Sequence, residues 1–226
     1  MSITKRIVCL ANSRKMQGRC VAGRELDAGV VGAWIRPVSD RPAEEVSEYE
    51  RQYQDGSDPR VLDIIHVPLI EARPKDYQRE NWLLDPQLYW VKRGTLGWED
   101  LSSLQDRRGP LWVNGNSSYN GRNDRIPLAQ AIELDSSLKL IHVRNFELRV
   151  FAPGEAFGNT KRRVQARFAF DGVDYGLWVT DPIVERQYLA QPDGEYAVDE
   201  AYLTISIGEP YQDYCYKLVA TVIGRA

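Results

Sequence analysis

The sequence contains few cysteines, which stabilise many secreted domains as disulfides, and no long apolar run of the kind that spans a membrane. It has three cysteines, Cys9, Cys20 and Cys215, and none lies at a Cys-x-x-Cys spacing. An odd number of isolated cysteines in apolar stretches is typical of reduced core residues in a reducing compartment. No apolar run approaches the roughly 20 residues that a membrane-spanning helix needs, and residues 7–11 are too short for a signal-peptide core. We therefore expect a cytoplasmic protein without a membrane segment.

Motifs of the common enzyme classes are also missing. The two histidines, His66 and His142, lie singly in strand-like runs, which indicates neither a metal site nor a catalytic pair. No Gly-x-Ser-x-Gly motif is present. Residues 18–25 have the glycine spacing of a P-loop, but Arg24 and Glu25 occupy the positions that need Lys and a hydroxyl. The sequence predicts no cofactor and no metal, and it favours a protein that is not an enzyme.

Charge is distributed unevenly along the chain. The net charge of −3 argues against strong nonspecific affinity for nucleic acid. However, the first 24 residues contain six basic residues and no acidic one, whereas residues 171–213 contain ten acidic residues and one basic residue. Such asymmetry produces a local positive field that the total charge conceals.

The two halves of the chain show the same order of predicted elements. In the first half, a helix that begins near Ser39 or Asp40 follows the third strand; in the second half, a helix capped by Asp181 does so. The third strands share a Gly-x-Trp-aliphatic motif, at residues 32–35 and 176–179, which suggests duplication. The predicted strands are residues 5–11, 19–26, 30–38 and 61–70, then 139–151, 163–170, 173–180, 202–207 and 214–223.

Five short strands with a helix between the third and the fourth are typical of the OB-fold, a partly open Greek-key barrel. We predict a mainly β protein with two OB-like barrels, residues 1–76 and 138–226, joined by a Trp-rich connector at residues 77–137. The connector is expected to contain short helices at 98–105 and 126–134. A six- or seven-stranded sandwich is the alternative, but it gives no reason for a helix at that position in both halves.

Three segments carry a resemblance to a known family. They are residues 5–15 (KRIVCLANSRK) continuing into 18–23 (GRCVAG), residues 33–39 (AWIRPVS), and residues 208–210 (GEP) with 215–220 (CYKLVA). The chain resembles the bacterial dual OB-containing domain family over essentially its whole length. The resemblance implies two OB-folds and recognition of nucleic acid or nucleotides in bacterial defence or conflict systems. It implies no catalytic residues.

Basic residues gather where the first strand of each half turns into the second. In an OB-fold this loop flanks the ligand-binding face. Arg and Lys bind phosphates, while Asn and Ser offer hydrogen bonds to sugars or bases. Arg36, on the third strand, and Lys217, on the last strand, are further candidates. The predicted binding residues are Asn12, Ser13, Arg14, Lys15, Arg19, Arg36, Lys161, Arg162, Arg163 and Lys217.

These residues predict a non-catalytic module that binds nucleic acid, preferably single-stranded, or a nucleotide. Two alternatives remain open. One is a nucleotide-processing enzyme that uses Lys15 or Lys217; residues 15–19 are similar to the Lys-x-Asp-Gly motif of nucleotidyltransferase ligases, but Gln17 replaces the Asp. The other is an adaptor whose barrel loops bind a protein partner. The same residues are also compatible with ordinary turns and strand edges that bind nothing.

Overall fold

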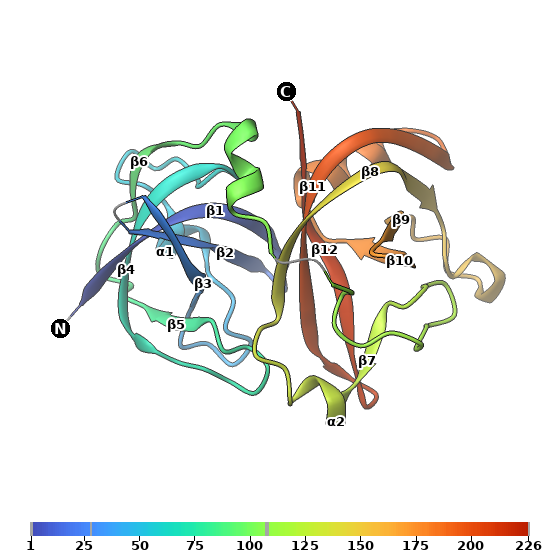
Figure 1. The fold of residues 1–226 in the computed structure, drawn as a ribbon, viewed down its shortest axis with the longest axis horizontal. Coiled ribbons are helices and arrows are strands. Elements are labelled where there is room, and N and C mark those ends of the chain that lie inside the picture. The colour runs from blue at the N-terminus through green and yellow to red at the C-terminus, as the bar shows by residue number, and fades with distance from the viewer. Residues whose placement is uncertain (1, 28, 107–108, 226) are drawn as a thin grey trace. The chain divides into compact units, whose positions relative to one another are not determined.

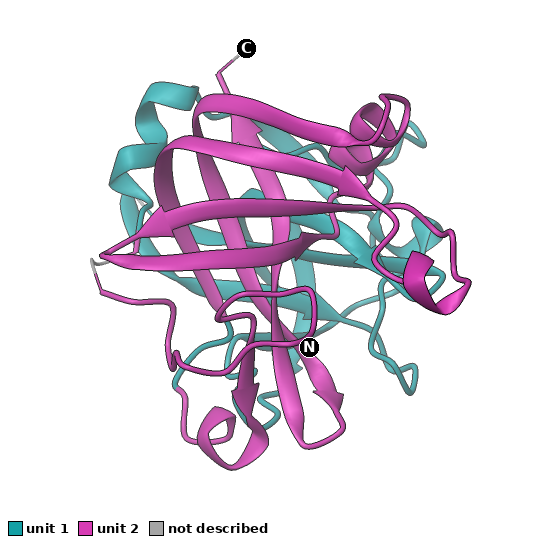
Figure 2. Cartoon of the chain, turned by 90° about the vertical axis from the view of Figure 1, so that its right-hand side faces the viewer, with its two compact units in different colours: residues 1–105, 135–137 teal, residues 106–134, 138–226 magenta. Residues whose placement is uncertain are grey.

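The computed structural model describes residues 2–27, 29–106 and 109–225. The chain consists mainly of long strands with a few short helices (Figure 1). It divides into two compact units, which are coloured separately in Figure 2. Unit 1 comprises residues 1–105 and 135–137, and unit 2 comprises residues 106–134 and 138–226. Residues 77–137, which the sequence suggested as a connector, are thus distributed between the two units.

Unit 1 is an OB-fold barrel. Its strands hydrogen-bond in the order β1-β2-β3-β5-β4, and β1 also pairs with β4, which closes the barrel. The β3–β5 pairing is parallel, and the others are antiparallel. A sixth strand, β6, pairs with β4. The elements are β1 (Ile3–Lys15), β2 (Gly18–Asp27), β3 (Val30–Val38), α1 (Glu48–Arg51), β4 (Asp63–Ala72), β5 (Asn81–Leu84), β6 (Val91–Thr95) and η1 (Trp98–Ser103).

Unit 2 repeats this topology. Its order is β10-β9-β8-β11-β12, and a parallel pairing of β10 with β12 closes the barrel. The short β7 pairs with β12. The prediction of two OB-like barrels with a helix after each third strand is confirmed. The elements are β7 (Arg125–Pro127), α2 (Leu128–Ala131), β8 (Leu138–Phe151), η2 (Glu155–Phe157), β9 (Arg163–Phe170), β10 (Val173–Val179), α3 (Pro182–Leu189), β11 (Gly194–Tyr211) and β12 (Tyr214–Gly224).

The two helices that were predicted to follow the third strands differ in outcome. Helix α3 begins where the sequence indicated, because the Asp181 carboxylate accepts hydrogen bonds from two backbone N–H groups of the first turn. The first-half helix does not start at Ser39 or Asp40. It is the single turn α1, which is capped by Ser47 in a capping box with Glu50. Glu44 has a left-handed φ of 58°, which interrupts any helix that starts earlier.

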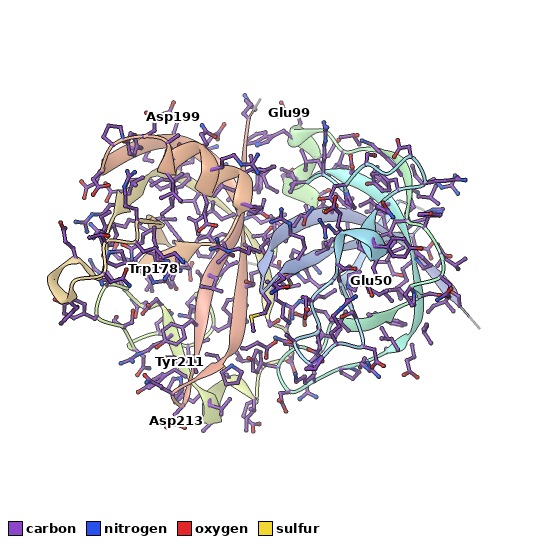
Figure 3. All side chains as sticks on the ribbon, turned by 180° about the vertical axis from the view of Figure 1, so that it is seen from behind. Glu50, Glu99, Trp178, Asp199, Tyr211 and Asp213 are labelled. Carbon is purple, nitrogen blue, oxygen red and sulfur yellow. The ribbon has the colours of Figure 1, made fainter. Side chains whose placement is uncertain are left out.

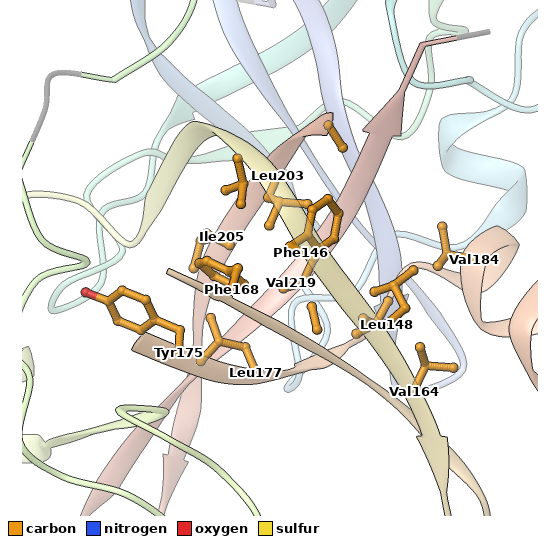
Figure 4. Close-up of a cluster of buried hydrophobic side chains, with 14 of the residues drawn as sticks. Phe146, Leu148, Val164, Phe168, Tyr175, Leu177, Val184, Leu203, Ile205 and Val219 are labelled. Atoms are coloured by element: carbon orange, nitrogen blue, oxygen red, sulfur yellow. The ribbon is translucent and has the colours of Figure 1, made fainter. Parts of the chain in front are cut away.

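Each barrel encloses its own apolar core. In unit 2, alternate residues of β8, β9 and β10 point inward, as Phe146, Leu148, Val164 and Leu177 do in Figure 4. Burial of each such side chain contributes about 1.5–3 kcal/mol. In unit 1 the corresponding core includes Ile7, Cys9, Val21, Ile35, Ile65, Val67, Leu69 and Trp90.

The third strands share an arginine–tryptophan contact. Trp34 of β3 and Trp178 of β10 are both buried, and Trp178 is labelled in Figure 3. An arginine from the second strand covers each ring: Arg24 lies 5.1 Å from the Trp34 ring centroid and Arg163 lies 4.3 Å from that of Trp178. The repeated topology supports the duplication that the sequence suggested, and the two Arg–Trp contacts differ in register, because Arg24 lies opposite Trp34 whereas Gln165 lies opposite Trp178.

Candidate nucleic-acid interface

The first predicted basic turn brings its charged residues together at the end of the β1–β2 hairpin. Arg14 pairs across the hairpin with Arg19, and Lys15 pairs with Gly18. Asn12 and Ser13 instead serve the barrel. The Asn12 side-chain amide donates to the carbonyl of Pro59 at 2.8 Å, and Ser13 is buried.

The three basic residues of the second predicted loop, residues 161–163, differ in role: one is exposed, and the other two contact other parts of unit 2. Lys161 is exposed. The Arg162 guanidinium pairs with Asp193 at 2.5 Å and donates to the backbone carbonyl of Leu189, the last residue of α3. Arg163 lies over Trp178, as described above. Because Arg162 holds the end of a helix through these contacts, it is not a candidate residue of the interface.

Arg36 lies inside unit 1, not on a binding surface. Its Nη2 atom lies 2.9 Å from Glu80 Oε1 and donates to Ser137 Oγ at 2.6 Å, while Nη1 donates to Asn81 Oδ1 at 3.3 Å. Both charged side chains are 3% exposed. The end of β3 is buried because β5 pairs beside it. The partners of Arg36 come from residues 80–81 and 137, and for this reason the local sequence pattern did not reveal them.

Lys217 is fully buried in unit 2. Its ammonium donates to Val113 O at 2.7 Å, to Asn114 Oδ1 at 2.8 Å and to Asn123 O at 2.8 Å. Burial lowers the pKa of Lys217 to about 7, and the nearby Asp124 carboxylate opposes this shift. Since an ammonium has three N–H groups and all three are used here, Lys217 does not bind a phosphate in this structure.

A groove of about 560 Å³ crosses the outer face of β8, β9 and β10 in unit 2. In the OB-fold the second and third strands, here β9 and β10, carry the ligand face. Three arginines line the groove, Arg122, Arg149 and Arg167, and none of them was singled out from the sequence. The remaining lining residues are Tyr119, Asn120, Gly121, Glu147, Gln165, Phe168, Asp174, Tyr175 and Gly176.

A second hollow, of about 530 Å³, adjoins this groove. The two share Glu147, Arg167 and Phe168 as lining residues. The second hollow continues over β11, where Ala197 and Asp199 line it. Together they form a track across the barrel from residues 119–122 to β11, which suits an extended ligand better than a compact one.

The arginines of the groove are paired with carboxylates. Arg122 lies 2.8 Å from Asp174, and Arg167 lies 3.7 Å from Glu147. Arg149 lies 3.7 Å from Glu195. Exposed pairs of this kind contribute at most about 1 kcal/mol each, so a ligand can replace the carboxylates at little cost. The groove therefore offers many hydrogen-bond donors with a nearly balanced charge.

Two exposed aromatic rings lie beside the groove. Tyr119, on the groove wall, is 81% exposed, and Phe157, on η2 in the β8–β9 loop, is 75% exposed. Their ring centroids are 5.9 Å apart, at an angle of 65°. The β8–β9 loop is the L12 loop of this barrel. A third exposed ring, Tyr211, lies with Asp213 at the turn between β11 and β12, the L45 position (Figure 3).

The wall that carries Tyr119 is fixed to the barrel by hydrogen bonds. Gln165, which is buried, donates to the carbonyl of Asn120 at 2.6 Å. The backbones of Arg122 and Gly176 exchange two hydrogen bonds, at 3.2 and 2.9 Å. Because these contacts hold the segment against β9 and β10, it forms a wall of defined shape although it has little regular secondary structure.

A family model described as "Dual OB-containing domain" matches residues 5–222. The chain belongs to this family. The match to the dual OB-containing domain spans both barrels, in agreement with the repeated strand order. No curated protein and no solved structure matches the chain.

Within the part of this dual OB protein that the structure describes, no three or more His, Cys, Asp or Glu side chains are grouped as a metal site would require. The helices of the same residues are too short or too polar to cross a membrane.

Proposed function

We propose that this dual OB protein is a recognition module that binds single-stranded nucleic acid, or a nucleotide, in the groove of unit 2. The observation that carries the proposal is an arginine-lined track on the OB ligand face with the exposed pair Tyr119 and Phe157 beside it. Aromatic rings next to a groove with hydrogen-bond donors are the features with which OB-folds hold unpaired bases.

Stacking and hydrogen bonding supply most of the affinity in this proposal. A base stacked on an aromatic side chain contributes about 1–3 kcal/mol. Arg122, Arg149 and Arg167 can bind phosphates or base edges. Because carboxylates lie beside all three guanidinium groups, we expect few released counterions and a weak dependence of affinity on salt.

The basic turn of unit 1 is proposed as a separate phosphate-binding surface. Arg14, Lys15 and Arg19 lie together at the end of the β1–β2 hairpin. Lys161 lies in the equivalent β8–β9 loop of unit 2. For a single strand, the slope of log K against log salt falls by about 0.7 for every phosphate that a variant no longer neutralises. Changing Arg14, Lys15 and Arg19 to Ala is expected to flatten the slope. An unchanged slope in a folded variant would assign these residues to turn structure alone.

The groove is tested by the variant Tyr119→Ala/Phe157→Ala. We expect its Kd for fluorescein-labelled 12-nucleotide DNA and RNA strands of mixed sequence, measured by anisotropy, to rise at least about 30-fold, since removing two stacked rings costs about 2 kcal/mol or more. The matched control is Tyr49→Ala, which removes a ring that is 70% exposed on α1 of unit 1. Equal Kd values for the double variant and the wild type would refute binding at this groove.

A further inference from the structure

The middle of the groove wall, residues 113–124, is held by Gln165 and Gly176, and its two ends meet at one buried side chain. The wall carries Tyr119, Asn120, Gly121 and Arg122, the residues that line the groove on this side. None of these residues belongs to a named helix or strand. Both ends of the wall meet at Lys217: Val113 and Asn114 at the start, and Asn123 and Asp124 at the end.

Lys217 joins these two ends to the barrel. Its ammonium lies 2.7–2.8 Å from one oxygen each of Val113, Asn114 and Asn123. Its backbone N–H donates to the carbonyl of Asp124 at 2.7 Å. The side chain extends from β12, a central strand of the closed barrel, and its ammonium lies 5.3 Å from the ring centroid of Tyr175.

The chemistry of this contact requires a lysine. Three acceptors converge on one atom, and only an ammonium places three N–H donors on a single nitrogen at the end of a flexible chain. An apolar side chain of the same length would leave all three oxygens without this donor. The Asp124 carboxylate near the ammonium accepts from the backbone N–H of Ser118 at 2.7 Å, which extends the same network into the wall.

We propose that Lys217 is the positioning residue of the groove: it holds the wall closed on β9 and β10 so that Tyr119 and Arg122 face the ligand, and it does not touch the ligand itself. The expected effect of Lys217 on ligand affinity rests on the proposed function. A ligand that needs the closed wall binds with an apparent Kd that rises in inverse proportion to the fraction of molecules in which the wall is closed.

The packing inside the wall shows why its ends control its middle. A Cβ atom on Gly121 would lie 1.9 Å from an oxygen of the Asp124 carboxylate, so the turn folds tightly onto its own end. The Asn123 side chain accepts from the N–H of Gly115 at 2.7 Å and donates to the carbonyl of Asp174 at 2.9 Å. Loss of the Lys217 ammonium releases Asn123 and Asn114, while the backbone bond to Asp124 stays, and this loosens the turn that presents Tyr119.

The test uses Lys217→Met in the full chain, with hydrogen–deuterium exchange and anisotropy with the same 12-nucleotide strands. We expect faster exchange confined to residues 113–124 in the free variant, a Kd raised at least about 10-fold, and recovery of protection at saturating oligonucleotide. The control is Lys139→Met, a neighbouring lysine whose ammonium donates to Pro110 O, outside the wall, at 3.1 Å. It is expected to leave both readouts unchanged.

Three results would overturn the inference: unchanged exchange in residues 113–124, an unchanged Kd despite faster exchange there, or acceleration spread equally over β8–β12. If Lys217→Met does not fold, Asn114→Ala removes one acceptor and is expected to produce the same local pattern at smaller amplitude. Failure of the wild-type protein to bind either strand would refute the proposed function, while the exchange measurement would still decide whether Lys217 holds the wall.

Discussion

The buried pair of Arg36 and Glu80 provides a sharp test of how unit 1 is stabilised. The variant Arg36→Met keeps most of the side-chain volume but leaves the Glu80 carboxylate, which is 3% exposed, without its guanidinium partner. Removing one member of a buried ion pair costs about 3–5 kcal/mol, because the remaining charge stays desolvated. Glu80 retains contacts with Ser137, so we expect a loss near the lower end, about 3 kcal/mol.

The measurement is urea unfolding followed by far-ultraviolet circular dichroism, with the free energy of unfolding obtained by linear extrapolation. The double variant Arg36→Met/Glu80→Leu is expected to recover most of the loss, since replacing both charges with apolar groups is often nearly neutral. The control is Arg73→Met. Arg73 pairs with Asp40 at 2.7 Å, but the two side chains are 38% and 82% exposed, and the expected loss is below about 1 kcal/mol.

Two outcomes would refute the reasoning. If Arg36→Met costs no more than Arg73→Met, the buried pair does not carry the assigned stability. If the double variant costs the sum of the single variants Arg36→Met and Glu80→Leu, the two side chains are not coupled, and the 2.9 Å contact between Arg36 and Glu80 is energetically irrelevant.

Further predictions concern stability. Burial lowers the pKa of Lys217 to about 7, below its ordinary value of about 10.4, so the folded protein binds fewer protons than the unfolded chain between these pH values. The free energy of unfolding should therefore rise with pH in this range, by at most about 1.4 kcal/mol per pH unit. Urea titrations at pH 7, 8 and 9 should show this slope in the wild type and no such slope in Lys217→Met. Gly23→Ala should lower the thermal midpoint strongly, because its Cβ would lie 2.0 Å from the carbonyl oxygen of Val8; Gly224→Ala, with no atom within 4 Å, is the control. Tyr53→Phe should cost about 1–3 kcal/mol in urea unfolding, because the Tyr53 hydroxyl donates to the buried Asp63 at 2.8 Å; an unchanged value would mean that Asp63 is satisfied by its other contacts.

The sequence predicted the bounds of two strands without error, β3 at residues 30–38 and β9 at residues 163–170. In β9, residues 163–170 alternate, and the predicted bounds match those of the strand. The four residues of β5 were missed because so short a segment shows no periodicity, and its partner β3 pairs with it in parallel from a distant part of the sequence. Strand β11 was predicted at 202–207 but spans Gly194–Tyr211, because its acidic first half pairs along β8.

The candidate site was harder to predict than the fold. The basic turn of Arg14, Lys15 and Arg19 is local in sequence, and the structure does bring these residues together. Lys217 and Arg36 looked available because each is a charged residue between apolar or aromatic neighbours in a predicted strand. Their buried environments depend on acceptors that lie far away in the chain, such as Asn123 for Lys217 and Glu80 for Arg36. No local pattern indicates that a distant loop will cover a given lysine.

Residues 135–137 belong to unit 1 although part of unit 2 precedes them in the sequence, and this affects both the order of synthesis and the choice of fragment boundaries. The polypeptide passes between the units at residues 105–106, 134–135 and 137–138. During synthesis, the first barrel lacks Ser137, a partner of Arg36 and Glu80, until a long stretch of the second unit has been translated. A gene fragment ending at residue 105 would encode a first barrel without this hydroxyl. A fragment starting at residue 138 would encode a second barrel without the wall of its groove. Recombination at either boundary therefore breaks a unit, although each barrel has a complete set of strands.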